Sequence, residues 1–234
     1  MKLGVMQPYL FPYIGYFQLI KAVDVFVIYD DVQFIKGGWI NRNRILFNGE
    51  WKFITLAVSR NESHDSRINE RHFARGFEEQ KVGIVRQLEA AYRRAPHFTE
   101  TMELVYKCFE CRDVNVSTFV SQTIQLCCSH LGIHTPLQMS SLIEDTTHFH
   151  GQDRIIWLNK IVGANQYVNA IGGKELYSKE TFALNNLRLA FLRSQANEYP
   201  QFGKPFVPWL SIIDVLMFNS RESAQLLLTK FDME

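Results

Sequence analysis

The sequence predicts a mixed α/β protein with a Rossmann-like, mainly parallel sheet of about five strands. Short apolar runs rich in β-branched and aromatic residues alternate with segments of helical periodicity, the pattern of parallel strands joined by helices. An Asn48-Gly49 turn between two further aromatic runs predicts a β-hairpin. Three consecutive helical patterns within about 77–131 predict a helical insertion. From the length of 234 residues we expect one α/β domain over 1–234.

The first elements form a strand–helix–strand unit. Residues 2–8 are expected to form a short buried strand that ends in proline. Ile14, Phe17 and Ile20 then recur at helical spacing. A continuous β-branched and aromatic run over 23–31 suits a parallel strand that is buried on both faces. The first thirty or so residues therefore predict a βαβ unit.

The later elements continue the alternation around the helical block. The hairpin is expected within 32–58, and the polar segment 59–76 is expected to be a surface loop. The helical patterns of the insertion occupy 77–94, 98–112 and 116–131. Beyond them we expect strands at 136–143, 166–173 and 187–193, and helices at 152–163 and 210–231.

Composition and charge exclude several classes of protein. The formal net charge is +1 without a basic block, which disfavours non-specific nucleic-acid binding, although an aminoacyl-tRNA partner stays open. No run approaches the roughly 18 apolar residues of a membrane span, so we expect no membrane partner. The N-terminus is interrupted by prolines and tyrosines and lacks a cleavage site, so it reads as mature structure and favours a cytoplasmic protein.

Four cysteines occur, and two of them form a C-x-x-C. Cys108 and Cys111 lie within a helical pattern, and no second C-x-x-C or H-x3-H completes a zinc-binding set. We therefore predict structural free thiols and no metal site.

Polar residues follow the first two predicted strands, where ligands bind in open parallel sheets. Asp30 and Asp31 end the second strand, and as candidate catalytic residues they could position an amine or act as a base. The alternative is that one caps a turn and the other is solvated. The candidate substrate-binding residues around these strand ends are Gln7, Tyr9, Tyr16, Gln33 and Lys36.

The W-x-N-R-N motif is a second candidate. On a strand, Asn41 and Asn43 share a face and Arg42 points to the other. Amides suit hydroxyl-rich ligands, and arginine suits phosphate or carboxylate through two parallel hydrogen bonds. The alternative is a hairpin with solvated polar residues.

Weaker candidates lie later in the chain. The turn Gly172-Gly173-Lys174 could approach a phosphate through its backbone N–H groups, or it could simply be a tight turn. His150, in an H-x-H on a loop, could act as a general base, or it could be a surface residue. Asp214 is expected to orient a neighbour in the site or to cap the last helix.

Three segments resemble the WbqC-like protein family. The long string over 7–45, beginning QPYLFPYIGYF and reaching GGWINRNRI, is similar to the family's N-terminal motif. FVPWLSIIDVLMFN over 206–219 and YVNAIGGKELY over 167–177 are similar to its later motifs. The resemblance implies a link with bacterial surface-polysaccharide (O-antigen, lipopolysaccharide) gene clusters. Transfer of an acyl or aminoacyl group to the amine of a nucleotide-linked amino sugar is the function we expect.

Two other functions stay open. The layout of the first βαβ unit is similar to that of HIGH-type nucleotidyltransferases, but Tyr13 and Tyr16 or nearby residues stand where that class has two histidines. This similarity would imply an ATP- and magnesium-dependent nucleotidyltransferase or amide ligase. A non-catalytic nucleotide-sugar-binding protein is the second alternative. A transferase would need an activated acyl donor, and the sequence does not identify that donor. The aromatic residues of 196–209 could line a homodimer contact or a lid.

Overall fold

The structure, a computed structural model, describes residues 1–63, 65–195, 198–203 and 205–234. Its main sheet has six strands in the order β5-β2-β1-β6-β7-β8. The strands are β1 (Lys2–Met6), β2 (Val25–Ile28), β5 (Leu137–Met139), β6 (Gln166–Ala170), β7 (Arg188–Ser194) and β8 (Phe231–Met233). All pairs are parallel except β7 with β8. The prediction of a Rossmann-like, mainly parallel sheet is confirmed.

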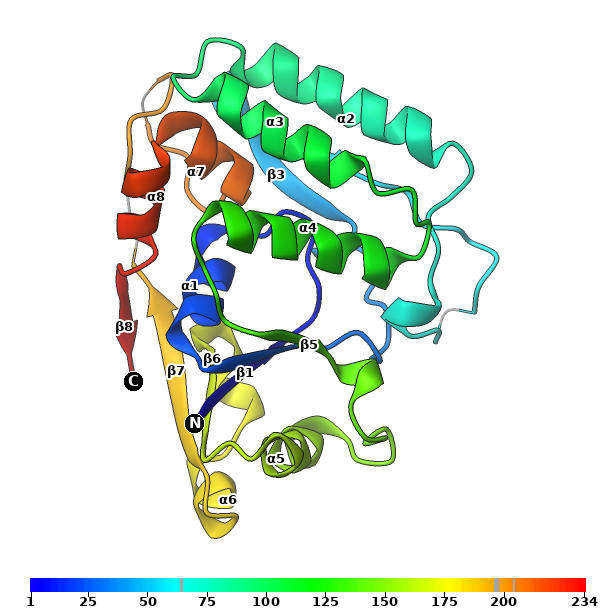
Figure 1. Cartoon of the computed structure of the whole chain (residues 1–234), viewed down its shortest axis with the longest axis vertical. Coiled ribbons are helices and arrows are strands. Elements are labelled where there is room, and N and C mark those ends of the chain that lie inside the picture. The colour runs from blue at the N-terminus through cyan, green and yellow to red at the C-terminus, as the bar shows by residue number, and fades with distance from the viewer. Residues whose placement is uncertain (64, 196–197, 204) are drawn as a thin grey trace.

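Helices cover both faces of this sheet (Figure 1). One face carries α1 (Ile14–Ala22), α4 (Val116–His130), α7 (Ile212–Phe218) and α8 (Arg221–Leu227), with α2 (Phe77–Tyr92) and α3 (Phe98–Phe109) stacked beyond them. The other face carries α5 (Gly151–Val162) and α6 (Lys179–Leu184). None of the helices in the described ranges is long and apolar enough to cross a membrane.

The two covered faces explain why the strands are apolar throughout. Leu3 and Val5 of β1 belong to the core under α5 and α6. Phe26 and Ile28 of β2 belong to the larger core under the other helices. Side chains that alternate along a strand therefore all meet a helix layer, as expected for a parallel strand between two layers.

The hairpin forms a separate two-stranded sheet of β3 (Arg42–Phe47) and β4 (Glu50–Thr55). Asn48 and Gly49 connect the strands with φ values of 53° and 83°. Positive φ at both central residues is the type I′ geometry, which matches the twist of the flanking strands. The prediction of a hairpin around Asn48-Gly49 is confirmed.

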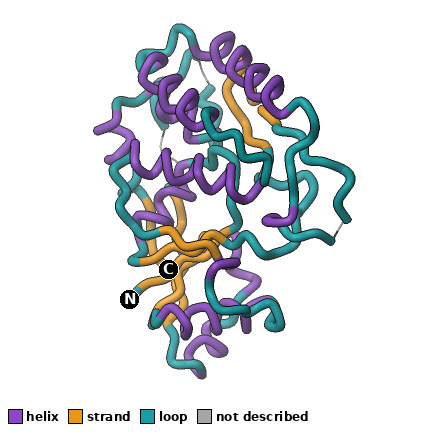
Figure 2. Tube along the Cα trace, turned by 45° about the vertical axis from the view of Figure 1, so that its right-hand side comes forward, coloured by secondary structure: helices purple, strands orange, loops and turns teal. Residues whose placement is uncertain are grey.

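The predicted helical insertion is also confirmed. The hairpin and the helices α2, α3 and α4 all lie between β2 and β5, which are neighbouring parallel strands. The tube view shows these helices as a layer beside the sheet, with the hairpin strands running through it (Figure 2). The crossover from β2 to β5 thus carries an extra block of structure.

The prediction of one helix over 210–231 is wrong. The chain leaves the helix at Asn219, which is extended, and Ser220 starts α8 by accepting a hydrogen bond from the Ser223 N–H at 3.2 Å. A serine at this position caps a new helix instead of continuing the old one. The last residues form β8, which pairs antiparallel with β7 and adds a sixth strand to the sheet.

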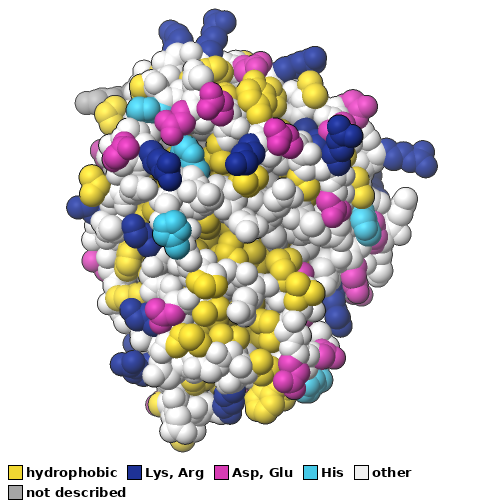
Figure 3. Space-filling model, viewed as in Figure 1, with side chains coloured by type: hydrophobic (Ala, Val, Ile, Leu, Met, Phe, Trp, Pro, Cys, Tyr) yellow, Lys and Arg dark blue, Asp and Glu magenta, His cyan; other side chains and the backbone are white. Residues whose placement is uncertain are grey.

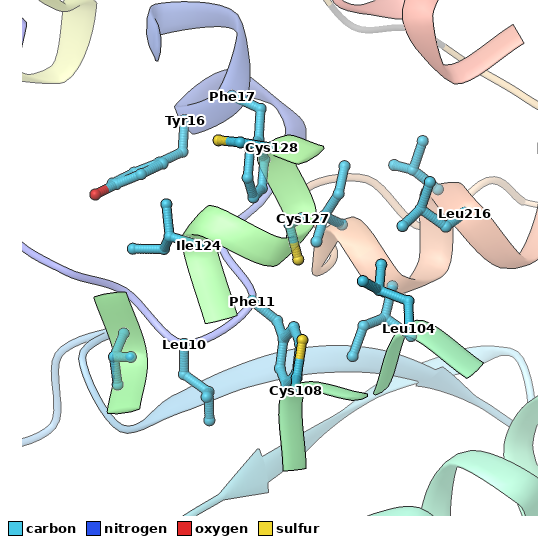
Figure 4. Packing of buried hydrophobic residues seen from close by; sticks show 14 of the residues in the cluster. Leu10, Phe11, Tyr16, Phe17, Leu104, Cys108, Ile124, Cys127, Cys128 and Leu216 are labelled. Atoms are coloured by element: carbon cyan, nitrogen blue, oxygen red, sulfur yellow. The ribbon is translucent and has the colours of Figure 1, made fainter. Parts of the chain in front are cut away.

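Three of the four cysteines, Cys108, Cys127 and Cys128, lie buried in the core between helices, and Cys111 is half-buried (Figure 4). Cys108 of α3 and Cys127 of α4 are fully buried near Phe11 and Ile124, and all four cysteines are free. A hydrogen bond with Cys108, together with burial, raises the pKa of the Cys127 thiol. Burial raises the pKa of Cys128 to about 12. Thiols of this kind stay protonated and unreactive near neutral pH, in agreement with the structural role predicted from the sequence.

Candidate functional site

The fold creates a crevice between β1 and β6. The chain crosses from β1 to β2 through α1 on one face of the sheet, and it reaches β6 through α5 on the other face. The loops that leave the carboxyl ends of β1 and β6 therefore diverge. This is the topological switch point at which open α/β sheets bind ligands.

A cleft of about 680 Å³ occupies this position. The residues that line it are Val5, Met6, Gln7, Tyr9, Pro12, Tyr13, Tyr29, Trp39, Asn43, Arg44, Asn169, Ala170, Gly172, Gly173, Leu176, Tyr177 and Trp209. They come from the ends of β1, β2 and β6, from β3, from the 3-10 turn η3 (Ile171–Leu176) and from the loop before α7. Its size is in the range of pockets for small ligands.

Tyrosines form much of the cleft wall. Burial raises the pKa of Tyr29, which directly follows β2, to about 12. Burial also raises the pKa of Tyr9, Tyr13 and Tyr177. Near neutral pH all four phenols are therefore protonated and can donate a hydrogen bond to a ligand.

Besides Asn43, two amides of the cleft lining add further hydrogen-bonding groups. Gln7 leaves the end of β1 and lines the cleft. Asn169 lies near the end of β6, where its Oδ1 accepts a hydrogen bond from the Ala170 N–H at 2.8 Å. The Nδ2 of Asn169 lies next to Gly173, where an added Cβ would stand only 2.5 Å away. Glycine at position 173 thus leaves room for this amide.

Arg44 is the cationic side chain of the cleft lining. Its guanidinium carbon lies 5.0 Å from the centroid of the Trp39 ring and 5.7 Å from that of Trp51. One amino group donates to the Trp209 carbonyl at 3.3 Å, while the buried Nε has no hydrogen-bond partner in the described ranges. A guanidinium held by aromatic rings is preorganised to bind an anionic group.

The loop after β1 is held in a strained conformation by distant parts of the chain. Phe11 has a φ of 42°, which is rare for a bulky residue. Its carbonyl accepts hydrogen bonds from Asn43 Nδ2 at 2.9 Å and from the Ser211 hydroxyl at 2.8 Å. Trp209 also has a positive φ, of 59°. Strain of this kind collects at functional sites, where the surrounding structure enforces it.

Asp214 anchors the loop that carries Trp209. Its fully buried carboxylate accepts hydrogen bonds from the hydroxyls of Tyr92 at 2.7 Å and Tyr199 at 2.6 Å. Gln201 Nε2 donates a third at 2.8 Å. Burial raises the pKa of the Asp214 carboxyl, while these hydrogen bonds act in the opposite direction. Asp214 thus orients its neighbours and does not line the cleft.

Asp30 ties the ends of β2 and β5 together. Its carboxylate accepts hydrogen bonds from the hydroxyls of Ser117 at 3.1 Å and Ser140 at 3.0 Å. Ser141 donates two more, from its backbone N–H at 3.0 Å and from its hydroxyl at 2.8 Å. The side chain lies away from the cleft between β1 and β6 and borders a second groove.

Asp31 forms a buried ion pair. Its carboxylate binds the guanidinium of Arg154 on α5 and lies within hydrogen-bond distance of the Ser140 hydroxyl. Both members of the pair are less than a tenth exposed. This pair joins the end of β2 to α5, on the face of the sheet that also carries α6. A catalytic role for Asp30, Asp31 or His150 stays a prediction; His150 is exposed at the start of α5.

Of the predicted substrate-binding residues, five meet in the cleft: Gln7, Tyr9, Asn43, Gly172 and Gly173. Tyr16 lies behind this wall, fully buried, and donates a hydrogen bond from its hydroxyl to the Gln7 carbonyl at 3.0 Å.

The others point to different partners. Asn41 donates to the Leu56 carbonyl at 2.7 Å, and Arg42 donates to the carbonyls of Gly37 and Gly38. Gln33 Nε2 donates to Asp65 at 3.0 Å. Lys174 pairs with Glu234 at 3.1 Å, and Lys36 is exposed.

The cleft also contains residues that the sequence did not single out. Arg44 follows directly after the W-x-N-R-N motif, and Asn169 lies in the YVNAIGG segment, so both were adjacent to recognised motifs. Trp209 lies in FVPWLS. Nothing in the local pattern distinguishes Tyr29 from an ordinary strand residue.

A second groove of about 880 Å³ runs between α4 and β5. Hydroxyl and amide side chains such as Ser121, Gln122 and Gln125 line it together with Asp30 and His134. The space-filling view shows mostly hydrophobic and uncharged side chains in the middle of the face on which α4 lies above β5 (Figure 3). In the described ranges, no group of three or more histidines, cysteines or carboxylates could hold a metal ion.

Comparison with known proteins places the chain in a family. The WbqC-like protein family matches residues 7–226. An uncharacterized protein of Mycobacterium tuberculosis is 30% identical over 223 residues, which is 93% of this chain and 93% of that protein. No solved structure matches the chain. Because the family match spans nearly the whole chain and every polar side chain that lines the cleft, the chain belongs to the WbqC-like protein family.

Proposed function

We propose that the protein is a transferase that acylates the amine of a nucleotide-linked amino sugar in the cleft between β1 and β6. The observation that carries this proposal is the composition of the cleft lining, with aromatic rings, neutral amides and one arginine at the topological switch point. Rings can stack on a base or a sugar face, amides suit sugar hydroxyls, and the guanidinium of Arg44 suits a diphosphate. A role in making bacterial surface polysaccharide is what the resemblance to this family implies, and it forms part of the proposal.

The cleft chemistry suits attack by an amine on an activated acyl group. In this reaction the sugar nitrogen forms a bond to the acyl carbon, the bond from that carbon to its leaving group breaks, and a proton from the amine leaves with the leaving group. After the nitrogen has attacked and before the leaving group departs, the carbonyl oxygen carries a negative charge. The protonated phenol of Tyr29 and the amides of Gln7 and Asn169 are donors that could stabilise this charge.

The lining favours this reaction over ATP-dependent adenylation. Magnesium in nucleotide sites is held through carboxylates and phosphates. No aspartate or glutamate is among the described residues that line the cleft. Acyl transfer from an already activated acyl donor needs no magnesium ligand. The side chains that line the cleft therefore agree better with a transferase.

The test is incubation of the protein with nucleotide-linked amino sugars and acyl donors, followed by mass spectrometry of the sugar. We expect the wild type to add the mass of the acyl group and Asn169→Ala to lose at least about 10²-fold in rate, the effect typical of removing one transition-state donor. Arg44→Gln removes the contact assigned to the diphosphate, so we expect it to raise the KM for the nucleotide-linked sugar. Arg86→Gln is the matched control, since Arg86 is exposed on α2.

Each result has a defined meaning. Tight binding of a nucleotide sugar without turnover by any donor would instead identify a binding protein. Absence of both binding and turnover in the wild type would refute the proposal.

A further inference from the structure

The hairpin and the preceding Trp39 present a partly exposed face made of aromatic rings and arginines. Arg42 and Arg44 alternate on β3, and Trp51 and Phe53 alternate on β4. Arg44 is directly opposite Phe53 in the register, so these side chains share one face. We call Trp39, Arg42, Arg44, Trp51 and Phe53 the aromatic–arginine face.

The side chains of this face pack against one another. The Phe53 ring centroid lies 5.2 Å from that of Trp51 and 6.2 Å from that of Trp39. The guanidinium carbon of Arg42 lies 4.4 Å above the centroid of Phe53. The face is therefore a packed cluster of three rings and two guanidinium groups. Trp51 nevertheless remains 52% exposed and Trp39 37% exposed, so large ring surfaces are open to a partner.

Among the described residues, no carboxylate forms an ion pair with the arginines of the face. Arg42 donates to the carbonyls of Gly37 and Gly38, which hold the guanidinium in place. Lys36, which is exposed, precedes these glycines. A fixed positive field beside open rings complements a ligand that carries both phosphate and a planar base.

The aromatic–arginine face is continuous with the cleft. Trp39 and Arg44 belong to the face and also line the cleft. Arg44 donates a hydrogen bond to the carbonyl of Trp209, which also lines the cleft. A ligand that lies on the face can thus extend a flexible arm past Arg44 toward the carboxyl ends of β1 and β6.

We propose that the aromatic–arginine face docks the phosphorylated adenosine end of a coenzyme A thioester, which is the acyl donor for the cleft. The adenine stacks on Trp51, and Arg42 and Lys36 meet the phosphates, while Arg44 in the cleft lining is left for the sugar diphosphate. This inference rests on the proposed transferase function. It adds the class of donor, for which the sequence offered no motif.

The reaction balances with a thioester donor. The sugar amine bonds to the thioester carbon, the carbon–sulfur bond breaks, and the amine proton ends on the sulfur of the released thiol. No oxidant, metal or second energy source is needed. The long arm between the adenosine end and the thioester lets the two subsites lie apart.

The charge of the protein favours this donor over an aminoacyl-tRNA. A helical RNA stem presents phosphates over a long surface and calls for a broad basic patch. The formal net charge here is only +1, and the hairpin offers two arginines on the face with Lys36 beside it. A compact ligand with a few phosphates matches that small cluster.

The experiment is isothermal titration calorimetry with adenosine 3′,5′-bisphosphate, the end of coenzyme A that the face would hold. We expect wild-type binding that weakens with salt, and binding about tenfold weaker in Trp51→Ala, as is typical for loss of one base–ring stack. Arg42→Gln should also bind more weakly. Trp51→Phe keeps a ring and should retain most of the affinity, which separates stacking from misfolding.

Two matched controls lie outside the face. Trp157, on α5, is as exposed as Trp39, so Trp157→Ala should leave binding unchanged. Lys52 lies in the same strand as Trp51 but alternates to the other side of the hairpin, so Lys52→Gln should also have no effect.

The outcomes separate this inference from the proposed function. A protein that binds a nucleotide-linked amino sugar but not the bisphosphate overturns the donor site and leaves the transferase standing. The donor site is equally overturned if Trp51→Ala changes nothing, if the nucleotide sugar competes with the bisphosphate, or if only a short RNA ending in CCA binds. If neither small ligand binds, both proposals fail.

Discussion

Asp30 and Asp31 are neighbours in the chain, yet their carboxylates have different partners. Asp30 is surrounded by serine hydroxyls, and Asp31 is paired with Arg154. Both arrangements give a buried carboxylate hydrogen-bonding or charged partners, without which its burial would cost free energy. The same logic applies to Asp214, whose carboxylate receives two phenols and an amide. Adjacent acidic residues at a strand end can therefore serve to hold elements together.

The ion pair of Asp31 leads to a stability prediction. Asp31→Ala leaves the buried guanidinium of Arg154 without its partner, and we expect the free energy of unfolding to fall by about 3–5 kcal/mol. Urea denaturation followed by circular dichroism measures this. Lys174→Gln is the control, because its ion pair with Glu234 is half-exposed and should contribute no more than about 1 kcal/mol. Equal losses in the two variants would contradict the assigned difference in burial.

At the scale of elements, the cleft is assembled by connections more than by the sheet. The 3-10 turn η3 follows β6 directly and brings Gly172, Gly173 and Tyr177 to the cleft. The hairpin contributes Arg44, and the loop before α7 contributes Trp209. Each connection is short or strained, so small backbone changes at these positions should alter binding more than stability.

The two glycines of η3 provide a direct comparison. Gly173→Ala would place a Cβ 2.5 Å from Asn169 Nδ2 and displace that amide, whereas a Cβ at Gly172 would meet nothing within 4 Å. We expect Gly173→Ala to weaken binding of a nucleotide-linked amino sugar about tenfold, the loss of roughly one hydrogen bond. Gly172→Ala should bind like the wild type. Titration calorimetry on both variants decides the matter, and equal affinities would remove Asn169 from the site.

For the whole molecule, the N-terminal segment and the segment before α7 are hydrogen-bonded to each other beside the cleft. Ser211 donates from its N–H to the Arg44 carbonyl at 2.8 Å, and its hydroxyl donates to the Phe11 carbonyl at 2.8 Å. The Ile212 N–H donates to the Pro12 carbonyl at 2.9 Å. The N-terminal motif over 7–45, which includes Arg44 of β3, and the motif over 206–219 thus contact each other directly. This contact explains on physical grounds why two distant segments of the family pattern, 7–45 and 206–219, occur together.

These hydrogen bonds predict that the chain unfolds as one unit. We expect a single urea transition in which tryptophan fluorescence and far-ultraviolet circular dichroism coincide, as in a cooperative single domain. Trp39, Trp51 and Trp209 report on the cleft region, while circular dichroism is dominated by the helices. An earlier, separate transition in either signal would show that the helical block of 77–131 is a domain of its own.

Local pattern was sufficient for most of the elements. Apolar periodicity located β1, α1 and β2, and the Asn48-Gly49 turn located the hairpin, because these signals act between residues close in sequence. The same approach failed at β8, since a three-residue strand of mixed composition forms only because the edge of β7 is available to it. The break between α7 and α8 was missed because Ser220 can lie within a helix or cap one.

The sequence by itself determined the class of the fold and the family, because strands, helices and motif residues can be recognised one segment at a time. The region in which ligands bind stays a prediction from the strand ends. Only the tertiary structure decided which side chains share the cleft. Gln7 and Asn169 are far apart in the chain, and they meet because β1 and β6 are neighbours in the sheet. Asp30 and Asp31 are turned to other partners by contacts with Ser140 and Arg154, which no local pattern encodes. Side-chain direction depends on packing between distant elements, and so it is settled only when the whole chain has folded.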